Sequence, residues 1–449
     1  TFGANPIKLS DAPYSSDELI KAGVSIARNA CRDFKDSYVA LDIGPSGKLL
    51  KPVGDLSFED AVKSFALMVK SGKDADLILI ETMSDIYETK AALLAAKENS
   101  NLPVVVTLFF DEHGRLLTGG DIKTAIGVIE GLGADAIGLN CGLGPEQMLK
   151  LIPEFLKYSS LPVVANPNAG LPVSENGKTV FKVEPSEFAE DMKKMAELGI
   201  SVAGGCCGTT PAHIEKTVEL LKDIKLKPVE FKNHTFVTSY SHSVDISCEL
   251  PVIIGERINP TGKKRLKEAL KANDMSYILN EALSQEEKGA HILDVNVGMN
   301  EIDQKEMMKK IVYEIQSVSD IPLQIDAEDP EVLETALRMY NGKAMVNSVN
   351  GKEESMKAVF PLIKKYGGVV VALCLDENGI PDTAEGRFSI ALKISEKAKE
   401  YGIDIKNIVF DPLAMTVSTG KDNANITLET IKLIKERLNA NTVMGVSNI

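Results

Sequence analysis

Residues 201–208 read Ser-Val-Ala-Gly-Gly-Cys-Cys-Gly, a short apolar run followed by two adjacent cysteines among three glycines. The apolar run predicts a β-strand, Ser201–Gly204, that ends at the cysteine pair. Neighbouring residues of a regular strand point to opposite faces of a sheet. The glycines allow the backbone to turn, so that Cys206 and Cys207 can face the same side.

The same pattern, an apolar run that ends in polar residues, recurs along the first half of the chain. These runs alternate with longer amphipathic segments, which predicts βα units on a parallel sheet. We expect six strands, at Val39–Asp42, Leu77–Glu81, Val104–Phe109, Ala136–Asn140, Pro162–Ala165 and Ser201–Gly204. Helices between them are expected at Ser57–Ser71, Asp85–Asn99 and Pro185–Leu198. A (βα)₈ barrel has eight strands, so we expect a barrel that lacks its N-terminal strand or strands in this chain.

The alternation stops between Asp223 and Leu250. Lys227-Pro228 and the polar run Thr238–Ser243 show no helical period. We therefore predict a linker over residues 223–250, between a first domain of residues 1–222 and a second of residues 251–449. An extension packed on the first domain is the alternative.

The alternation then restarts in the second half. Seven strands are expected, at Val252–Glu256, Ile292–Asn296, Pro322–Ile325, Ala344–Asn347, Val369–Leu373, Ile408–Asp411 and Thr442–Val446. The predicted fold class is α/β, with two (βα)₈ TIM-type barrels in tandem, the second lacking its last strand. A doubly wound open sheet is the alternative, but no Gly-x-Gly-x-x-Gly follows a first strand.

Composition excludes several classes of protein. The net charge of −14 argues against a nucleic-acid partner. No apolar run approaches the ~20 residues that span a membrane, so no membrane partner is expected. Six cysteines in 449 residues are too sparse for a secreted disulfide scaffold. We expect a cytoplasmic protein with free or metal-bound thiols.

Three of the cysteines suggest a zinc site. Cys141 follows one predicted strand, and Cys206 and Cys207 follow another, so in a parallel barrel all three lie at one mouth. Three thiolates suit Zn²⁺ with an open fourth position. Three thiolates and Zn²⁺ together carry a charge of −1. This charge makes the centre a poor activator of water and favours alkylation of a thiolate bound to it. Buried thiols without a metal are the alternative, which we adopt for Cys31, Cys248 and Cys374.

Polar residues also end the other predicted strands. A single Asn or Asp of this kind is usually a turn or a helix cap. Ten such strand ends in one register indicate two polar barrel mouths. The candidate binding residues are Glu81, Thr82, Asn140 and Asn168 in the first half, and Glu256, Asn259, Asp326, Asn347, Asp411 and Ser447 in the second.

The first half resembles the homocysteine S-methyltransferase family. The resemblance is carried by Thr1–Asn5, Glu81-Thr82, Gly138–Gly142, Pro167–Gly170 and Gly204–Gly208. It implies that Cys141, Cys206 and Cys207 bind zinc, and that the zinc binds homocysteine.

The second half resembles the pterin-binding barrels shared by dihydropteroate synthases and methyltetrahydrofolate methyltransferases. The matching stretches are Gly255–Gly262, Asp294–Asn296, Asp326, Asn347-Ser348, Phe410–Pro412 and Gly445–Asn448. A pterin presents N–H donors at its 2-amino group and N3, which Asp326 or Asp411 could accept, with Asn347 and Asn448 pairing to other ring atoms. Methyl release requires a proton at N5, and the candidate catalytic residues for its delivery are Asp294, Asn296 and Asn448.

The two domains in this order resemble cobalamin-dependent methionine synthases. That resemblance implies 5-methyltetrahydrofolate as methyl donor, homocysteine as acceptor, and a cobalamin-binding module as partner. The Asp-x-His-x-x-Gly signature of that module is not found in this chain. Two alternatives stay open: a betaine- or methylmethionine-type methyltransferase without cobalamin, and a zinc-binding protein without catalysis.

Overall fold

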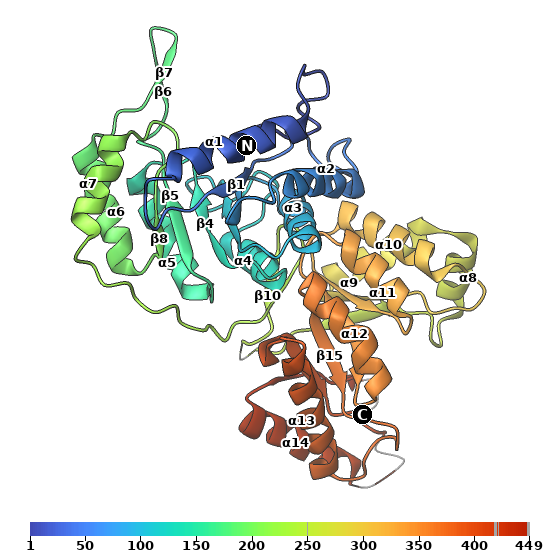
Figure 1. The fold of residues 1–449 in the computed structure, drawn as a ribbon. Helices are drawn as coiled ribbons and strands as arrows, with labels where there is room; N and C mark the ends of the chain where they lie inside the picture. The colour runs from blue at the N-terminus through green and yellow to red at the C-terminus, as the bar shows by residue number, and fades with distance from the viewer. Residues whose placement is uncertain (249, 417–419, 421, 447–449) are drawn as a thin grey trace. The chain divides into compact units, whose positions relative to one another are not determined.

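The computed structural model describes residues 1–248, 250–416, 420 and 422–446 (Figure 1). Contacts within the chain divide it into two units, Thr1–Lys232 and Asn233–Ile449. Each unit is an α/β fold built on a parallel sheet, as the alternation of strands and helices predicts. In the described part of the chain, no helix has the length and apolarity needed to cross a membrane.

The first unit contains a six-stranded parallel sheet whose strands follow one another in chain order, with β8 after β5. Its strands are β1 (Ala40–Ile43), β2 (Leu77–Met83), β3 (Val104–Leu108), β4 (Ala136–Asn140), β5 (Val163–Asn166) and β8 (Val202–Ala203). Each overlaps a strand expected from the sequence. This sequential order is the order of a (βα)₈ barrel, but no pairing among the described residues joins β1 to β8.

Helices separate these strands. They are α1 (Ser16–Cys31), α2 (Phe58–Ser71), α3 (Ile86–Asn99), α4 (Ile122–Gly131), α5 (Pro145–Tyr158), α6 (Pro185–Leu198) and α7 (Pro211–Leu221). Local sequence explains where they begin: Ser57 and Asp85 accept backbone N–H groups at the starts of α2 and α3, and Pro185 occupies the first turn of α6. The three helices expected from the sequence are thereby confirmed.

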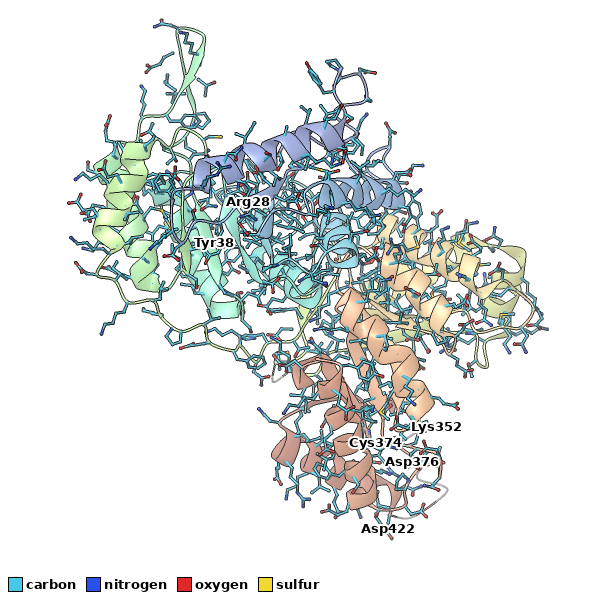
Figure 2. The ribbon with its side chains drawn as sticks, in the orientation of Figure 1. Arg28, Tyr38, Lys352, Cys374, Asp376 and Asp422 are labelled. Atoms are coloured by element: carbon cyan, nitrogen blue, oxygen red, sulfur yellow. The ribbon has the colours of Figure 1, made fainter. Side chains whose placement is uncertain are left out.

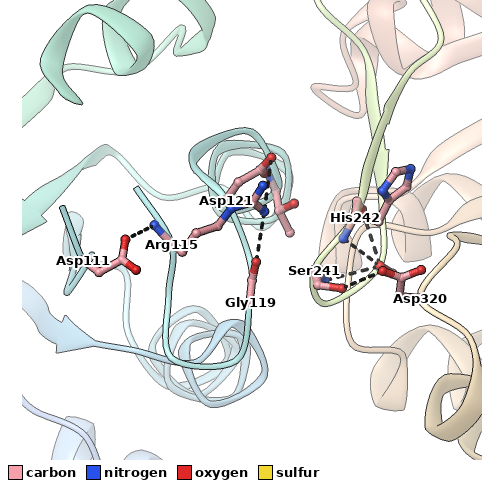
Figure 3. A network of polar contacts seen from close by, with 9 residues as sticks. Asp111, Arg115, Gly119, Asp121, Ser241, His242 and Asp320 are labelled. Carbon is pink, nitrogen blue, oxygen red and sulfur yellow. Dashed lines mark hydrogen bonds and ion pairs between the residues drawn. The ribbon is translucent and has the colours of Figure 1, made fainter. Parts of the chain in front are cut away.

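Two loops of the first unit have internal order of their own. After β3, Asp111 accepts a hydrogen bond from the backbone N–H of Arg115, and the Arg115 guanidinium donates to the carbonyl of Gly119 at 3.2 Å (Figure 3). Between β5 and α6, an exposed hairpin of β6 (Val173–Glu175) and β7 (Lys178–Val180) extends away from the unit (Figure 1). The sequence interpretation did not include this hairpin.

The second unit contains a seven-stranded parallel sheet, again in chain order. Its strands are β11 (Ile254–Ile258), β12 (Ile292–Asn296), β13 (Leu323–Asp326), β14 (Met345–Asn350), β15 (Val369–Leu373), β16 (Ile408–Asp411) and β17 (Asn441–Thr442). The helical elements are α8 (Lys264–Ala272), α9 (Met275–Glu287), α10 (Gln304–Val318), α11 (Pro330–Met339), α12 (Glu353–Tyr366), α13 (Ala384–Glu400), η1 (Ile405–Asn407), α14 (Asn423–Leu433) and η3 (Ile434–Leu438). All seven expected strands are present.

The expected linker is wrong from Asn233 onward. Strands β9 (Phe236–Thr238) and β10 (Ser243–Asp245) form an antiparallel hairpin that belongs to the second unit. Val237 and Val244 pack against residues at the N-terminal ends of the second sheet's strands, such as Ile292 and Val369. Burial of these two valines stabilises the hairpin on the second unit, because their apolar surface would otherwise be exposed to water.

Hydrogen bonds hold this hairpin to the second unit. The buried Tyr340 hydroxyl donates to the carbonyl of Thr238 at 2.9 Å and accepts from the backbone N–H of Leu323 at 3.0 Å. At the hairpin's turn, the Ser241 hydroxyl donates to Asp320 at 3.3 Å (Figure 3). The hairpin therefore covers the end of the sheet opposite to the C-terminal strand ends.

Candidate functional site

The three predicted zinc ligands lie together in the first unit. The Sγ atoms of Cys141, Cys206 and Cys207 are all within 4.8 Å of one another, and those of Cys141 and Cys207 are 3.8 Å apart. In a tetrahedron with zinc–sulfur bonds of about 2.3 Å, two sulfurs are about 3.8 Å apart. The thiols are half-buried or exposed, so a fourth ligand can approach. The donor set and its spacing therefore fit a zinc ion.

Backbone turns bring the three thiols together. Cys141 directly follows β4 with φ +58°, and its N–H donates to the carbonyl of Asn166 at 3.1 Å. The N–H of Cys206 donates to the carbonyl of Pro167, and the N–H of Cys207 donates to the Asn168 side chain at 3.0 Å. The loop after β5 thus fixes both cysteines, and the predicted residue Asn168 shapes the site through the backbone.

Glycine is required beside the cysteine pair. A Cβ atom at Gly204 would lie 2.4 Å from the Asn166 side-chain oxygen, and one at Gly208 would collide with the Phe181 ring. Gly208 also has φ +79°, which disfavours other residues. The glycines therefore allow both thiols to face one side, as the sequence predicts.

Asn140 connects the predicted polar residues around the thiols. The Asn140 side chain is fully buried. Its Nδ2 donates to the Thr82 hydroxyl at 2.8 Å and to Glu81 at 3.3 Å. Its Oδ1 accepts from the Thr82 N–H and from the Thr107 hydroxyl. The Asn140 Nδ2 also lies 3.9 Å from the Cys206 sulfur. Glu81, Thr82 and Asn140 are therefore brought to one place with the cysteines.

Asp42 is a site residue that the sequence reasoning missed. It hydrogen-bonds to Glu81, and its Oδ1 is buried with no partner among the described residues. Burial raises the pKa of Asp42 to about 6, and burial together with the charge of Asp42 raises the pKa of Glu81 to about 7. The position of Asp42 at the end of the predicted strand Val39–Asp42 was the sequence signal that could have identified it as a site residue. The two carboxyl groups form an acidic pair beside the thiols, and their raised pKa values favour a proton shared between them.

The thiols influence one another's ionisation. A hydrogen bond from Cys206 lowers the pKa of Cys141 to about 5. The same hydrogen bond and burial raise the pKa of Cys206, and burial raises the pKa of Cys207. A single thiolate is therefore favoured among the three, and a bound cation would favour ionisation of the others.

The remaining cysteines are only partly as expected. No other group of three potential ligands lies close enough to hold a metal within the residues described. Cys374 is fully buried near the end of β15 (labelled in Figure 2), and burial raises the pKa of its thiol to about 12. Cys31 is partly exposed and Cys248 is exposed, so the expectation of burial was wrong for these two. Both lie outside the regular strands that would bury them.

A second polar site lies in the second unit, at the C-terminal ends of its strands. A cavity of about 240 Å³ is lined by six of the predicted residues, Glu256, Asn259, Asp294, Asp326, Asn347 and Asp411. Asn296 does not line it but hydrogen-bonds to Asp326 from β12. The predicted residues Ser447 and Asn448 lie outside the described part of the chain.

The strand register arranges these residues in two levels. Asn296 is paired with Asp326, and Asp326 with Asn347, near the strand ends. Asp294 is paired with Gln324 one level deeper, and the Gln324 amide donates to Asp294 at 2.6 Å. Burial and the neighbouring Asp326 raise the pKa of Asp294 to about 7.

Arg387 of α13 supports the loop that follows β16. Its buried guanidinium donates to the carbonyls of Pro412 and Leu413 at 2.8 and 2.9 Å. Asp411, directly before this loop, accepts from the N–H of Leu413 at 2.8 Å, and burial raises its pKa. Sequence reasoning missed Arg387, because an arginine within an amphipathic helix gives no sign of burial.

Comparisons with known proteins agree with this division. Residues 1–221 match the homocysteine S-methyltransferase family, and residues 255–449 match the pterin binding enzyme family. The whole chain is 32% identical to the methionine synthases of Mycobacterium tuberculosis and of Mycobacterium leprae, and it spans 40% of the length of each. The metallated form of the homocysteine methyltransferase MmuM from Escherichia coli is 22% identical over 48% of this chain and 76% of that chain, with a TM-score of 0.41. That structural likeness is too distant to carry an argument.

Proposed function

Since the first half of the chain belongs to the homocysteine S-methyltransferase family and the second to the pterin-binding enzymes, we propose that it carries two sites of one methyl transfer. Methyltetrahydrofolate gives up its methyl group in the second unit, and homocysteine accepts it in the first. We further propose that each curled parallel sheet is the wall of a (βα)₈-type barrel. The products are tetrahydrofolate and methionine.

In the first unit, Cys141, Cys206 and Cys207 hold a zinc ion. When bound, the zinc would offer a fourth coordination position to a substrate thiol and would lower the pKa of that thiol. Three thiolate ligands would leave a net charge of −1 on such a centre, which would keep a substrate sulfur nucleophilic.

The carboxyl pair of Asp42 and Glu81 recognises the other end of homocysteine. An amino acid carries an ammonium group, and two adjacent carboxyl groups that share a proton become fully ionised when a cation binds between them. Asn140 holds Glu81 in place through the 3.3 Å hydrogen bond. This arrangement orients the substrate without adding a nucleophile.

In the second unit, the cavity binds the pterin ring. Asp326 or Asp411 accepts N–H groups of the ring, and Asn347 pairs with other ring atoms. Asp294 holds a proton near neutral pH, because its pKa is raised to about 7. It therefore delivers the proton that N5 needs when the methyl–nitrogen bond breaks, directly or through water, with Asn296 supporting Asp326.

The transfer between the sites requires a carrier. The N5 methyl group has a poor leaving group, so a strong nucleophile must take it. Cobalamin, held by a module other than the two units described, would supply a nucleophile of that strength. The residues of this chain bind and orient the two substrates that the carrier visits.

The juxtaposition of the three sulfurs carries this proposal. An isolated thiol has many uses. Three thiols within 4.8 Å of one another, beside the carboxyl pair of Asp42 and Glu81, suit a metal centre that binds a substrate thiol. Calorimetry of homocysteine binding to the zinc-loaded chain, in two buffers of different ionisation enthalpy at pH 7, tests it. Release of close to one proton is expected. Binding heat that is independent of the buffer would contradict zinc–thiolate binding.

A further inference from the structure

Gln324 is a buried residue of the second unit that the proposed reaction does not yet use. It is 6% exposed, lies on β13 and lines the 240 Å³ cavity. Its Nε2 donates to Asp294 at 2.6 Å. Its Oε1 is buried and has no hydrogen-bond partner in the part of the chain that the structure describes. A buried acceptor without a donor is costly, because its hydration is lost without replacement.

Gln285, on α9 of the same unit, shows the usual arrangement. It is also 6% exposed, but both ends of its amide are bonded. Its Oε1 accepts from the N–H of Arg257 at 2.8 Å, and its Nε2 donates to the carbonyl of Glu281 at 3.1 Å. Burial of a glutamine in this fold is therefore compatible with full hydrogen bonding. The unpaired Oε1 of Gln324 needs a separate explanation.

The register fixes where Gln324 points. It is paired with Asp294 on one side and with Met345 on the other, one level below Asp326. An oxygen of Asp294 accepts from Nε2 of Gln324, which leaves Oε1 on the other side of the amide group. Met345 offers no donor to Oε1. Gln324, which lines the cavity, thus holds an unpaired neutral acceptor next to the carboxyl group of Asp294.

We propose that Oε1 of Gln324 accepts a hydrogen bond from an N–H group of the bound pterin, and so determines which ring the second unit selects. This inference rests on the proposed function. A tetrahydropterin carries N–H donors at N3, N8 and the 2-amino group, which are more than one carboxylate can accept. Four acidic residues, Glu256, Asp294, Asp326 and Asp411, already line the cavity. An amide adds an acceptor without adding charge repulsion.

The test compares Gln324→Met with the wild-type chain, using calorimetric binding of 5-methyltetrahydrofolate and of its 8-deaza and 2-desamino analogues. The 8-deaza analogue lacks the N8–H donor, and the 2-desamino analogue lacks both N–H donors of the 2-amino group. The wild-type chain should bind at least one analogue about tenfold more weakly than the parent, which is the loss of one hydrogen bond. In Gln324→Met that difference should disappear, and the parent should bind about tenfold more weakly.

Two further variants separate recognition from folding. Gln324→Asn keeps a neutral acceptor oxygen, so it should retain part of the discrimination between the parent and that analogue. Gln316→Met, at a residue outside the cavity lining, should retain it as well. Unchanged discrimination in a folded Gln324→Met would overturn the inference and leave the proposed function intact. Failure of the wild-type chain to bind 5-methyltetrahydrofolate would overturn the proposed function, and the inference with it.

Discussion

The two sites are built by different means, although both lie at the C-terminal ends of parallel strands. In the first unit, backbone turns position the chemistry: Cys141 has a left-handed φ, and Cys206 and Cys207 are fixed by hydrogen bonds from their own N–H groups. In the second unit, regular strands position it, with Asp294 and Asp326 at successive levels of β12 and β13. A metal site of three thiolates needs three sulfurs around one point, which regular strands do not supply. A flat ring needs acceptors spread over a surface, which strand register supplies.

The largest expected effect is on the turn-built site. Cys206→Ser should weaken zinc binding at least about 100-fold, because it removes a ligand rather than a supporting contact. Cys141→Ser and Cys207→Ser should behave alike, whereas Cys374→Ser should keep its zinc. Competition with a chromophoric chelator measures the affinity. A full zinc complement in Cys206→Ser would rule out the site.

The strand-built site should respond to loss of one carboxylate. Asp326→Ala should weaken binding of 5-methyltetrahydrofolate roughly 10- to 100-fold, since hydrogen bonds to charged groups are worth about 1.5–3 kcal/mol. Its zinc content should stay unchanged. Asp382→Ala, an exposed residue of the same unit, is the matched control. Equal affinities in the two variants, measured by calorimetry, would contradict the assignment of Asp326.

The rate of the reaction at the strand-built site should depend on the protonation of Asp294. Protonated Asp294 is the proposed donor, and its pKa is about 7, so demethylation of 5-methyltetrahydrofolate should slow as pH rises through about 7. Asp294→Asn has no proton to give and should lower this rate roughly 10²-fold, with a flat profile over the same range. Rate–pH profiles for both proteins are the measurement. An identical decline above pH 7 in Asp294→Asn would assign the proton to another group.

The smallest expected effect concerns the hairpin of the second unit. Tyr340→Phe removes the hydroxyl that bonds to Thr238 and Leu323, and should cost the second unit about 1–3 kcal/mol of unfolding free energy. Tyr313→Phe, on α10, serves as the control. Urea unfolding measures the difference. Zinc content should not change in either variant, and a loss of zinc in Tyr340→Phe would show that the sites are not independent.

Local pattern explains what the sequence could predict. The strand Ala136–Asn140 was expected with the bounds that the structure has, because its apolar run and its polar end lie within a few residues. The three cysteines could be grouped for the same reason, since each lies within three residues of the end of a predicted strand. Helix starts such as that of α6 follow from a single proline.

Long-range register explains what it could not predict. The hydrogen bonds between Asp42 and Glu81 and between Asp294 and Gln324 join residues on different strands, and no local pattern fixes the strand register that brings them together. The strands β9 and β10 have too few apolar residues for their hairpin to be predicted from the sequence. The role of Val237 and Val244 becomes clear only from the sheet against which they pack.

The central claim is that one chain holds two separate substrate sites, and a crossed assay tests it most directly. Cys207→Ser and Asp326→Ala are each measured in two half-reactions with free cobalamin: demethylation of 5-methyltetrahydrofolate by cob(I)alamin, and methylation of homocysteine by methylcobalamin. Cys207→Ser should lose the second half-reaction and keep the first, and Asp326→Ala should do the reverse. Loss of both half-reactions in a folded Asp326→Ala would contradict the account.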